Sequence, residues 1–148
     1  EYQEAGNWVG ILYAVQAMGS VLWATMIPKF RSAKMAYVVS LLIGAVGFAS
    51  LYLVHNHYLM MVSLLLVGPA WAAMLALPFT LLTNALEGSP NMGTYLGLFN
   101  CTICLPQIVA ALLGGTILHL VGDSQPAMMV VTGFLLVLAA CSVRFIKK

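Results

Sequence analysis

The sequence predicts an all-α membrane protein with five transmembrane helices. Of its 148 residues, 62% are hydrophobic and only 7% are charged, against roughly 45–50% and about 25% in a soluble domain. A water-soluble fold of this length has too much surface for its volume to hide so many apolar side chains. The apolar residues also fall into five long runs, and a helix needs about 20 such residues to cross a bilayer.

The predicted spans are residues 7–27, 35–54, 58–86, 92–120 and 126–145. The segments between them are short and carry the Pro, Gly, Asn and charged residues that are typical of turns. A β-barrel is excluded because barrel strands alternate apolar and polar residues, whereas residues 64–82 are apolar almost throughout. Short connections predict antiparallel neighbouring helices in one bundle.

The distribution of charge predicts the orientation of the helices. All six basic residues fall on one side of a five-helix arrangement: Lys29, Arg31, Lys34, Arg144, Lys147 and Lys148. The other side carries acidic residues and histidines: Glu1, Glu4, His55, His57 and Asp123. Cytoplasmic loops of membrane proteins are enriched in Lys and Arg. We therefore expect a multi-pass protein of the cell membrane with its N-terminus outside and its C-terminus in the cytoplasm.

Other functional classes find little support in the sequence. A net charge of +2 does not suggest nucleic acid, and three cysteines do not form a disulfide framework. Cys101 and Cys104 lie within an apolar run, and His55 and His57 offer only two metal ligands. The chain has no phosphate-binding loop, carboxylate pair or nucleophile–base motif. We therefore predict neither an enzyme nor a protein that holds a metal or cofactor.

The span 92–120 carries small and polar residues at three- and four-residue steps, which places them on one helix face. This face is formed by Gly93, Gly97, Asn100, Cys104, Gln107, Ala111 and Gly114. Gly93 and Gly97 have the spacing that allows close contact between transmembrane helices. A side-chain amide in hydrocarbon costs several kcal/mol without a partner. Asn100 and Gln107 therefore either form hydrogen bonds between helices or line a cavity.

The span 58–86 is predicted to be long and interrupted. It contains Pro69 and Pro78, the span 92–120 contains Pro106, and a proline inside a helix removes a backbone donor and bends the helix. Both spans approach 30 residues, which is about 45 Å of helix, so we expect them to tilt, bend or protrude. A second stripe, Pro69, Ala73, Ala76, Thr80 and Asn84, runs along one face. Trp71 lies about 140° away from Asn84 on a helical wheel, which favours contact with lipid or another helix.

Several motifs resemble the sucrose-transporter-like branch of the major facilitator superfamily. They are Gly-Pro-Ala-Trp-Ala-Ala at 68–73, Leu-Pro-Phe at 77–79, Leu-Thr-Asn-Ala-Leu at 82–86, Met-Gly-Thr-Tyr-Leu-Gly-Leu-Phe-Asn at 92–100 and Leu-Pro-Gln-Ile at 105–108. The segment 8–10, Trp-Val-Gly, resembles the eighth helix of this branch. The basic segment 27–34 lacks the Asp-Arg and Gly of the usual loop, and Phe79 replaces a common Tyr.

The resemblance implies that this chain supplies helices eight to twelve of a twelve-helix carrier, an incomplete C-terminal half whose remaining helices belong to the same transporter. It implies secondary transport of a neutral sugar, a disaccharide, with protons, by alternating access. The candidate sugar-binding residues are Asn84, Tyr95, Asn100 and Gln107, with Gln16 a weaker candidate. No span has Asp, Glu, Lys or Arg in its middle, so a proton-carrying group would lie elsewhere in the carrier. The alternative is a membrane subunit or remnant without transport activity that packs against partner helices through Gly93 and Gly97.

Overall fold

A computed structural model describes residues 2–145 and contains five long helices. They are α1 (Tyr2–Met26), α2 (Ala33–Leu53), α3 (His57–Ala85), α4 (Met92–Leu120) and α5 (Gln125–Ser142). Two 3-10 turns, η1 (Ile27–Lys29) and η2 (Val143–Phe145), extend α1 and α5. All five helices are long and apolar enough to cross a membrane. The prediction of five membrane-spanning helices is therefore confirmed.

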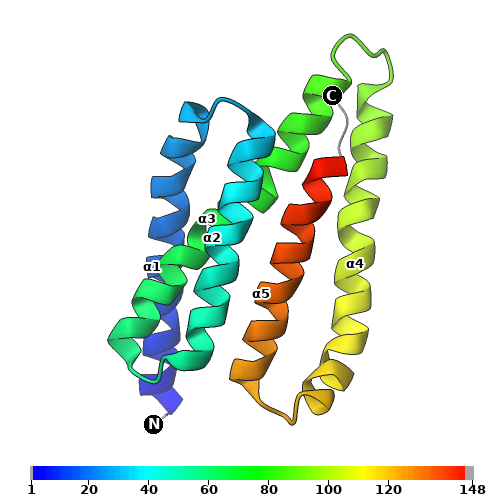
Figure 1. The fold of residues 1–148 in the computed structure, drawn as a ribbon. Helices are drawn as coiled ribbons and strands as arrows, with labels where there is room; N and C mark the ends of the chain where they lie inside the picture. Colours follow the sequence, from blue (N-terminus) through cyan, green and yellow to red (C-terminus); the bar gives the residue numbers. More distant parts are fainter. Residues whose placement is uncertain (1, 146–148) are drawn as a thin grey trace.

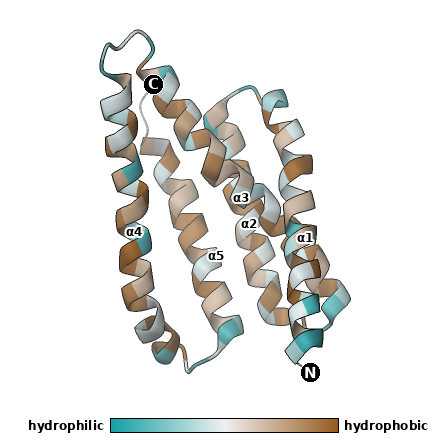
Figure 2. Ribbon diagram, turned by 180° about the vertical axis from the view of Figure 1, so that it is seen from behind, coloured by the Kyte–Doolittle hydropathy of each residue, from teal (hydrophilic) through white to brown (hydrophobic). Residues whose placement is uncertain are grey.

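The helices alternate in direction and form a bundle in which α3 crosses obliquely (Figures 1 and 2). The α1–α2 connection, the α3–α4 connection and the end of α5 lie at one end of the bundle (Figure 1). The start of α1, the α2–α3 connection and the α4–α5 connection lie at the other end. Figure 2 shows that the apolar residues cover the middle of the helices and that hydrophilic residues gather towards their ends.

The helix ends follow local capping chemistry. Helix α3 begins where the Asn56 side chain accepts a hydrogen bond from the Tyr58 amide (2.9 Å), and α5 begins at a similar Ser124 cap (3.4 Å). Helix α4 ends at Leu120 and is followed after one residue by Gly122, whose φ of +75° suits glycine. The Gly122 amide donates to His119 and the Asp123 amide to Leu118, which together form a Schellman motif.

Helix α1 begins at Tyr2, five residues before the predicted span 7–27. The backbone ladder of a helix continues past the edge of the hydrocarbon because water or headgroups can surround its polar side chains. Helices α3 and α4 contain 29 residues each, which is about 43 Å. Pro69 and Pro78 lie inside α3 and Pro106 inside α4 without ending either helix.

Small residues hold α1, α2 and α3 together. A Cβ added to Gly68 would lie 2.6 Å from the Gln16 carbonyl oxygen and 2.6 Å from the Ser20 amide nitrogen. A Cβ added to Gly44 would overlap the Cβ of Ala70. Such residues let two helix backbones approach each other closely.

Three side-chain hydrogen bonds join these three helices pairwise. The Ser20 hydroxyl of α1 donates to the Gly68 carbonyl of α3 (2.9 Å), and the Trp23 indole of α1 donates to the Ser40 hydroxyl of α2 (2.7 Å). The Ser50 hydroxyl of α2 donates to the Ser63 hydroxyl of α3 (2.8 Å). Helix α5 packs on α2 at Gly133. Polar groups of this kind stabilise helix association where water is absent.

Helix α4 packs differently from the other four helices. None of its residues is buried, although it has contacts with α5. Towards α3 it makes an edge-to-face contact between Phe79 and Phe99, with ring centroids 5.0 Å apart. The protein therefore consists of a packed unit of α1, α2, α3 and α5 with α4 beside it.

Candidate functional site

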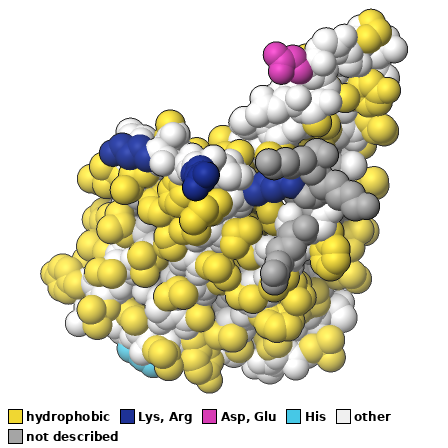
Figure 3. Space-filling model, turned by 45° about the horizontal axis from the view of Figure 1, so that its top comes forward, with side chains coloured by type: hydrophobic (Ala, Val, Ile, Leu, Met, Phe, Trp, Pro, Cys, Tyr) yellow, Lys and Arg dark blue, Asp and Glu magenta, His cyan; other side chains and the backbone are white. Residues whose placement is uncertain are grey.

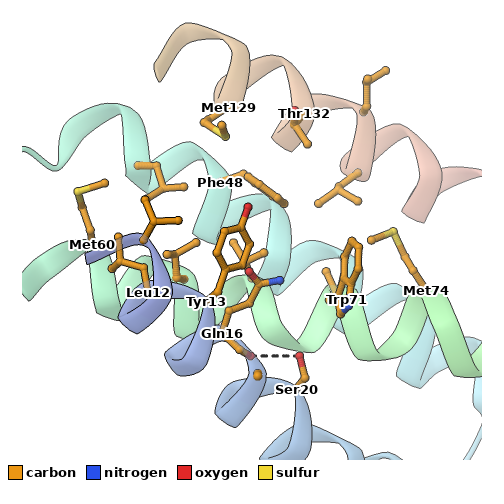
Figure 4. Close-up of a pocket in the computed structure, with 18 residues that line it drawn as sticks. Leu12, Tyr13, Gln16, Ser20, Phe48, Met60, Trp71, Met74, Met129 and Thr132 are labelled. Atoms are coloured by element: carbon orange, nitrogen blue, oxygen red, sulfur yellow. Dashed lines mark hydrogen bonds between the residues drawn. The ribbon is translucent and has the colours of Figure 1, made fainter. Parts of the chain in front are cut away.

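A cavity lies among α1, α2, α3 and α5 within the packed unit. Its volume is about 780 Å³, within the roughly 300–1,000 Å³ of small-molecule sites. Three of the helices contribute an aromatic ring: Tyr13 of α1, Phe48 of α2 and Trp71 of α3. Helix α5 contributes Met129 and Thr132 (Figure 4). Gln16 and Ser20 of α1 are also polar. The other lining residues are apolar: Val9, Leu12, Ala17, Leu51, Met60, Leu64, Val67, Ala70, Met74, Leu135 and Leu136.

The α1–α3 crossing positions one wall of this cavity. Pro69 has no amide hydrogen, so the carbonyl of Leu65, four residues earlier, loses its helical donor. Gly19 lies against this carbonyl, because a Cβ added there would be 2.5 Å from the Leu65 oxygen. Weak Cα–H···O contacts are typical of such close helix crossings. Gly19 and Gly68 therefore fix where Gln16 and Ser20 of α1 lie relative to Trp71 of α3.

Five side chains that line the cavity can form hydrogen bonds, and two of them already bond to the backbone. The Ser20 hydroxyl lies 2.9 Å from the Gly68 carbonyl and 3.1 Å from the Gln16 carbonyl. The Thr132 hydroxyl donates to the Met128 carbonyl (3.0 Å). The Gln16 amide, the Tyr13 hydroxyl and the Trp71 indole N–H form no hydrogen bond with any residue that the structure describes. These three groups remain for a hydrogen-bonding partner (Figure 4).

Trp71 lines the cavity and Asn84 does not, in agreement with their separation on the helical wheel. Trp71 is 53% exposed, but its ring borders the cavity beside Met74. The helical-wheel argument measured its angle from Asn84, and the cavity lies on a different face of α3. Gln16, the weaker candidate, does line the cavity. The sequence analysis missed Tyr13, although the spacing of Tyr13, Gln16 and Ser20 places them on one face of α1.

The four predicted sugar-binding residues lie outside this cavity. Asn84 is exposed near the end of α3, and Tyr95, Asn100 and Gln107 are exposed on α4. The stripe predicted on α3 is divided, because Pro69 and Ala73 are buried whereas Ala76, Thr80 and Asn84 are not. The structure therefore brings Tyr95, Asn100 and Gln107 onto one helix and does not bring them to the cavity of the packed unit.

Asn100 and Gln107 lie deep within the span of α4. They follow the first residue of the helix, Met92, by eight and fifteen residues, which is about 12 Å and about 22 Å along a helix of about 43 Å. Figure 2 shows hydrophilic positions interrupting the apolar ribbon of α4. Neither amide has a hydrogen bond to another described residue. The interhelical hydrogen bond considered from the sequence is thus not formed within the described chain.

Gly93 and Gly97, whose spacing allows close helix contact, face no other helix of the described chain. A Cβ at either position would meet nothing within 4 Å. The face that they share with Asn100 and Gln107 is open along the described chain. It remains a prediction that another helix covers this face.

The two ends of the bundle differ in charge. Lys29, Arg31 and Lys34 lie around the α1–α2 connection, and Lys and Arg side chains are visible across this end (Figure 3). Glu87, in the α3–α4 connection, lies at the same end. Glu1, Lys147 and Lys148, which belong to the charge prediction, lie outside the described residues, as does the side chain of Arg144. Among residues 2–145 no group of three or more His, Cys, Asp or Glu could hold a metal ion.

Comparison with known proteins identifies one family. The model of the Major Facilitator Superfamily matches residues 1–148. No curated protein matches the chain, and no solved structure matches it.

Proposed function

The chain belongs to the major facilitator superfamily of transporters, and from this premise we propose that it forms part of a secondary carrier for a neutral sugar. We place it as helices eight to twelve, in the C-terminal half of a twelve-helix bundle. The substrate proposed is a disaccharide moved with protons. The sequence motifs of α3 and α4 that resemble sucrose-transporter-like carriers support this assignment.

The observation that carries the proposal is the pair of amides on α4. Asn100 and Gln107 are exposed at membrane depth, and no described residue accepts or donates a hydrogen bond to either. Leaving such a group in hydrocarbon costs several kcal/mol. Their partner must therefore be another part of the transporter, water or the substrate.

An amide face suits a sugar better than it suits most other substrates. Asn and Gln both donate and accept hydrogen bonds, and a sugar hydroxyl does the same. Tyr95 adds a phenol that is 45% exposed, and an aromatic ring can stack on the apolar face of a sugar ring. Asn84 supplies a further exposed amide at the end of α3.

Proton coupling and orientation complete the proposal. The middle of each span lacks an ionisable Asp, Glu, Lys or Arg, so the proton-carrying group belongs to another helix of the carrier.

The basic end, with Lys29, Arg31 and Lys34, faces the cytoplasm. A cysteine at His55 should then react with a membrane-impermeant maleimide added outside intact cells, and a cysteine at Ser32 should not. If only the Ser32→Cys variant is labelled, the orientation is the opposite of the one proposed.

Uptake measurements test the proposed site. In the complete polypeptide that contains these residues, Asn100→Leu and Gln107→Leu should abolish uptake of radiolabelled sucrose or maltose while the protein stays in the membrane. Asn91→Leu makes the same chemical change just before α4 begins and should preserve uptake. A protonophore should stop accumulation by the unmodified protein.

Three outcomes would count against the proposal. If both α4 variants take up sugar as the unmodified protein does, Asn100 and Gln107 do not bind the sugar. If a protonophore does not affect sugar uptake, transport is not coupled to protons. If the protein takes up no sugar, the proposed substrate class is wrong, whereas the superfamily assignment still holds.

A further inference from the structure

Aromatic rings join α1 and α3 at the end of the bundle away from the α1–α2 connection. The Trp8 and His57 rings have centroids 5.2 Å apart and planes tilted by 35°. The Tyr58 ring meets Trp8 edge-on, with centroids 6.0 Å apart and planes at 90°. The start of α1 and the α2–α3 connection lie together at this end (Figure 1). His57, the first residue of α3, therefore packs directly against α1.

This ring contact is separate from the close crossing of the same two helices. The backbones of α1 and α3 approach each other at Gly19 and Gly68. Gly19 follows Trp8 by eleven residues. Gly68 follows His57 by the same number, so the crossing lies about 16 Å along each helix from the rings. The rings therefore add a second contact between α1 and α3 near the ends of the pair.

The strength of this contact depends on the charge of the imidazole. Histidine is the side chain whose charge ordinarily changes between about pH 5 and pH 8, and His57 is exposed, so protons can reach it. A cation within about 6 Å of an indole centroid is attracted to the ring face. The Trp8 and His57 rings meet this distance, and their planes are closer to parallel than to perpendicular. Protonation of His57 thus adds an attraction to a contact that already exists.

The titratable groups on the elements that meet at His57 are all exposed. They are Glu4 on α1, Tyr52 near the end of α2, His55 in the α2–α3 connection and Tyr58 on α3. Glu4 lies one turn before Trp8 on the same face of α1, and His55 is a second imidazole. At the same end of the bundle, the Asp123 carboxylate already pairs with the His119 imidazole of α4 (2.7 Å). Glu4 and His55 are therefore the groups that an experiment must distinguish from Trp8 and His57.

We propose that His57 and Trp8 form a proton-sensitive contact that stabilises the start of α3 against α1 when His57 is protonated. A contact that favours the protonated form stabilises the fold at low pH. Its contribution is lost as the pH rises through the range in which histidine loses its proton. In the orientation proposed above, this end lies outside the cell, so the contact responds to external pH. Only that last step rests on the proposed function.

SDS-induced unfolding of the complete polypeptide in mixed micelles tests the contact. His57→Phe keeps an aromatic ring beside Trp8 and removes the charge. Relative to this variant, the unfolding equilibrium constant of the unmodified protein should fall by about two- to fivefold between about pH 8 and pH 5, the effect of an exposed cation–π pair. His55→Phe is the matched control, since His55 is exposed two residues earlier and has no ring contact with a described residue. It should retain the pH dependence of the unmodified protein, as should Glu4→Gln.

Tryptophan fluorescence gives a second measurement that does not require unfolding. The difference in emission between the unmodified protein and Trp8→Phe isolates the contribution of Trp8. A protonated imidazole in contact with an indole quenches its emission, so this contribution should decrease as the pH is lowered. The same difference, measured in the His57→Phe background, should not depend on pH.

Two results would overturn the proposal. The first is an equal pH dependence of unfolding and of Trp8 emission in the unmodified protein and in His57→Phe. The second is loss of the pH dependence in His55→Phe or Glu4→Gln, which would assign it to another imidazole or to an ion pair with the carboxylate. None of these measurements uses sugar uptake, so failure of this proposal and failure of the transport proposal are distinguished.

Discussion

Helices α3 and α4 have the same length, similar apolar content and internal prolines, yet only one of them is packed. Helix α3 buries Gly68, Pro69, Ala70 and Ala73 against its neighbours, whereas α4 buries no residue. Helix α3 contains one glycine, Gly68, and α4 contains four, Gly93, Gly97, Gly114 and Gly115. The difference lies in what faces those glycines.

The glycines of α3 and its neighbours meet backbone atoms. Gly68 faces Gln16 and Ser20, and Gly19 faces the carbonyl of Leu65. The glycines of α4, Gly93 and Gly97, meet nothing within 4 Å. A small-residue face thus permits helix contact but does not by itself create one, since association also needs a partner of complementary shape and hydrogen bonding.

Alanine substitutions of these glycines should show the largest difference. Gly68→Ala places a Cβ 2.6 Å from backbone atoms of α1 that cannot rotate away, and overpacking costs about 3 kcal/mol or more when no side chain can yield. Gly93→Ala adds a Cβ to open space and should leave the stability unchanged or raise it by up to about 1 kcal/mol. SDS-induced unfolding in mixed micelles measures both.

Gly133→Ala provides an intermediate case that does not depend on Gly68→Ala folding. Its Cβ would lie 3.0 Å from the Ala45 carbonyl, so we expect a loss of about 1–3 kcal/mol. Equal stability of all three variants would show that the α1–α3 and α2–α5 contacts are not formed in the protein.

Hydropathy and length were sufficient to predict the five helices. Each span is a mostly apolar run with no Asp, Glu, Lys or Arg in its middle, and a bilayer forces such a run to satisfy its own backbone hydrogen bonds as a helix. The predicted helix starts were less accurate, since α1 begins at Tyr2 and not at residue 7. Polar residues outside the hydrocarbon continue the backbone hydrogen bonds of the helix. The packing faces were harder still, since the same small residues appear on α3 and α4.

The candidate sites show where sequence reasoning stops. Asn100 and Gln107 were selected because amides are rare in apolar spans, and neither amide forms a hydrogen bond with another described residue. The cavity was not found, because its aromatic residues come from three helices. Aromatic residues in a membrane span are not unusual, so Phe48 and Trp71 gave no signal before the helices were placed together.

The interhelical hydrogen bond of Trp23 should have a moderate effect. Trp23→Phe and Ser40→Ala each break the 2.7 Å bond between α1 and α2 and should each cost about 0.5–1.5 kcal/mol. Thr102→Val on α4 removes a hydroxyl that donates to Phe99 of its own helix (2.7 Å) and should change stability much less. The unfolding free energies of these three variants sharpen the contrast between the helices.

A double-mutant cycle decides whether the bond itself is responsible. Trp23→Phe and Ser40→Ala should be non-additive, because the second substitution removes a partner that the first has already lost. Strict additivity would instead assign the losses to packing. The Ser40 hydroxyl also donates to Ala36 of its own helix, so some loss independent of Trp23 is expected from Ser40→Ala.

The smallest effect on global stability should come from the contact between α3 and α4. Phe99→Leu removes the edge-to-face pair with Phe79, which is worth about 0.5–1.5 kcal/mol. Because α4 buries nothing, it can separate from the packed unit without unfolding the rest. Hydrogen exchange should therefore become faster in α4 while the global unfolding free energy changes by less than about 0.5 kcal/mol. Leu98→Ala, at a neighbouring exposed position, should leave the exchange of α4 unchanged. Faster exchange in α1 or α2 as well would mean that α4 belongs to the packed unit and that the two regions unfold together.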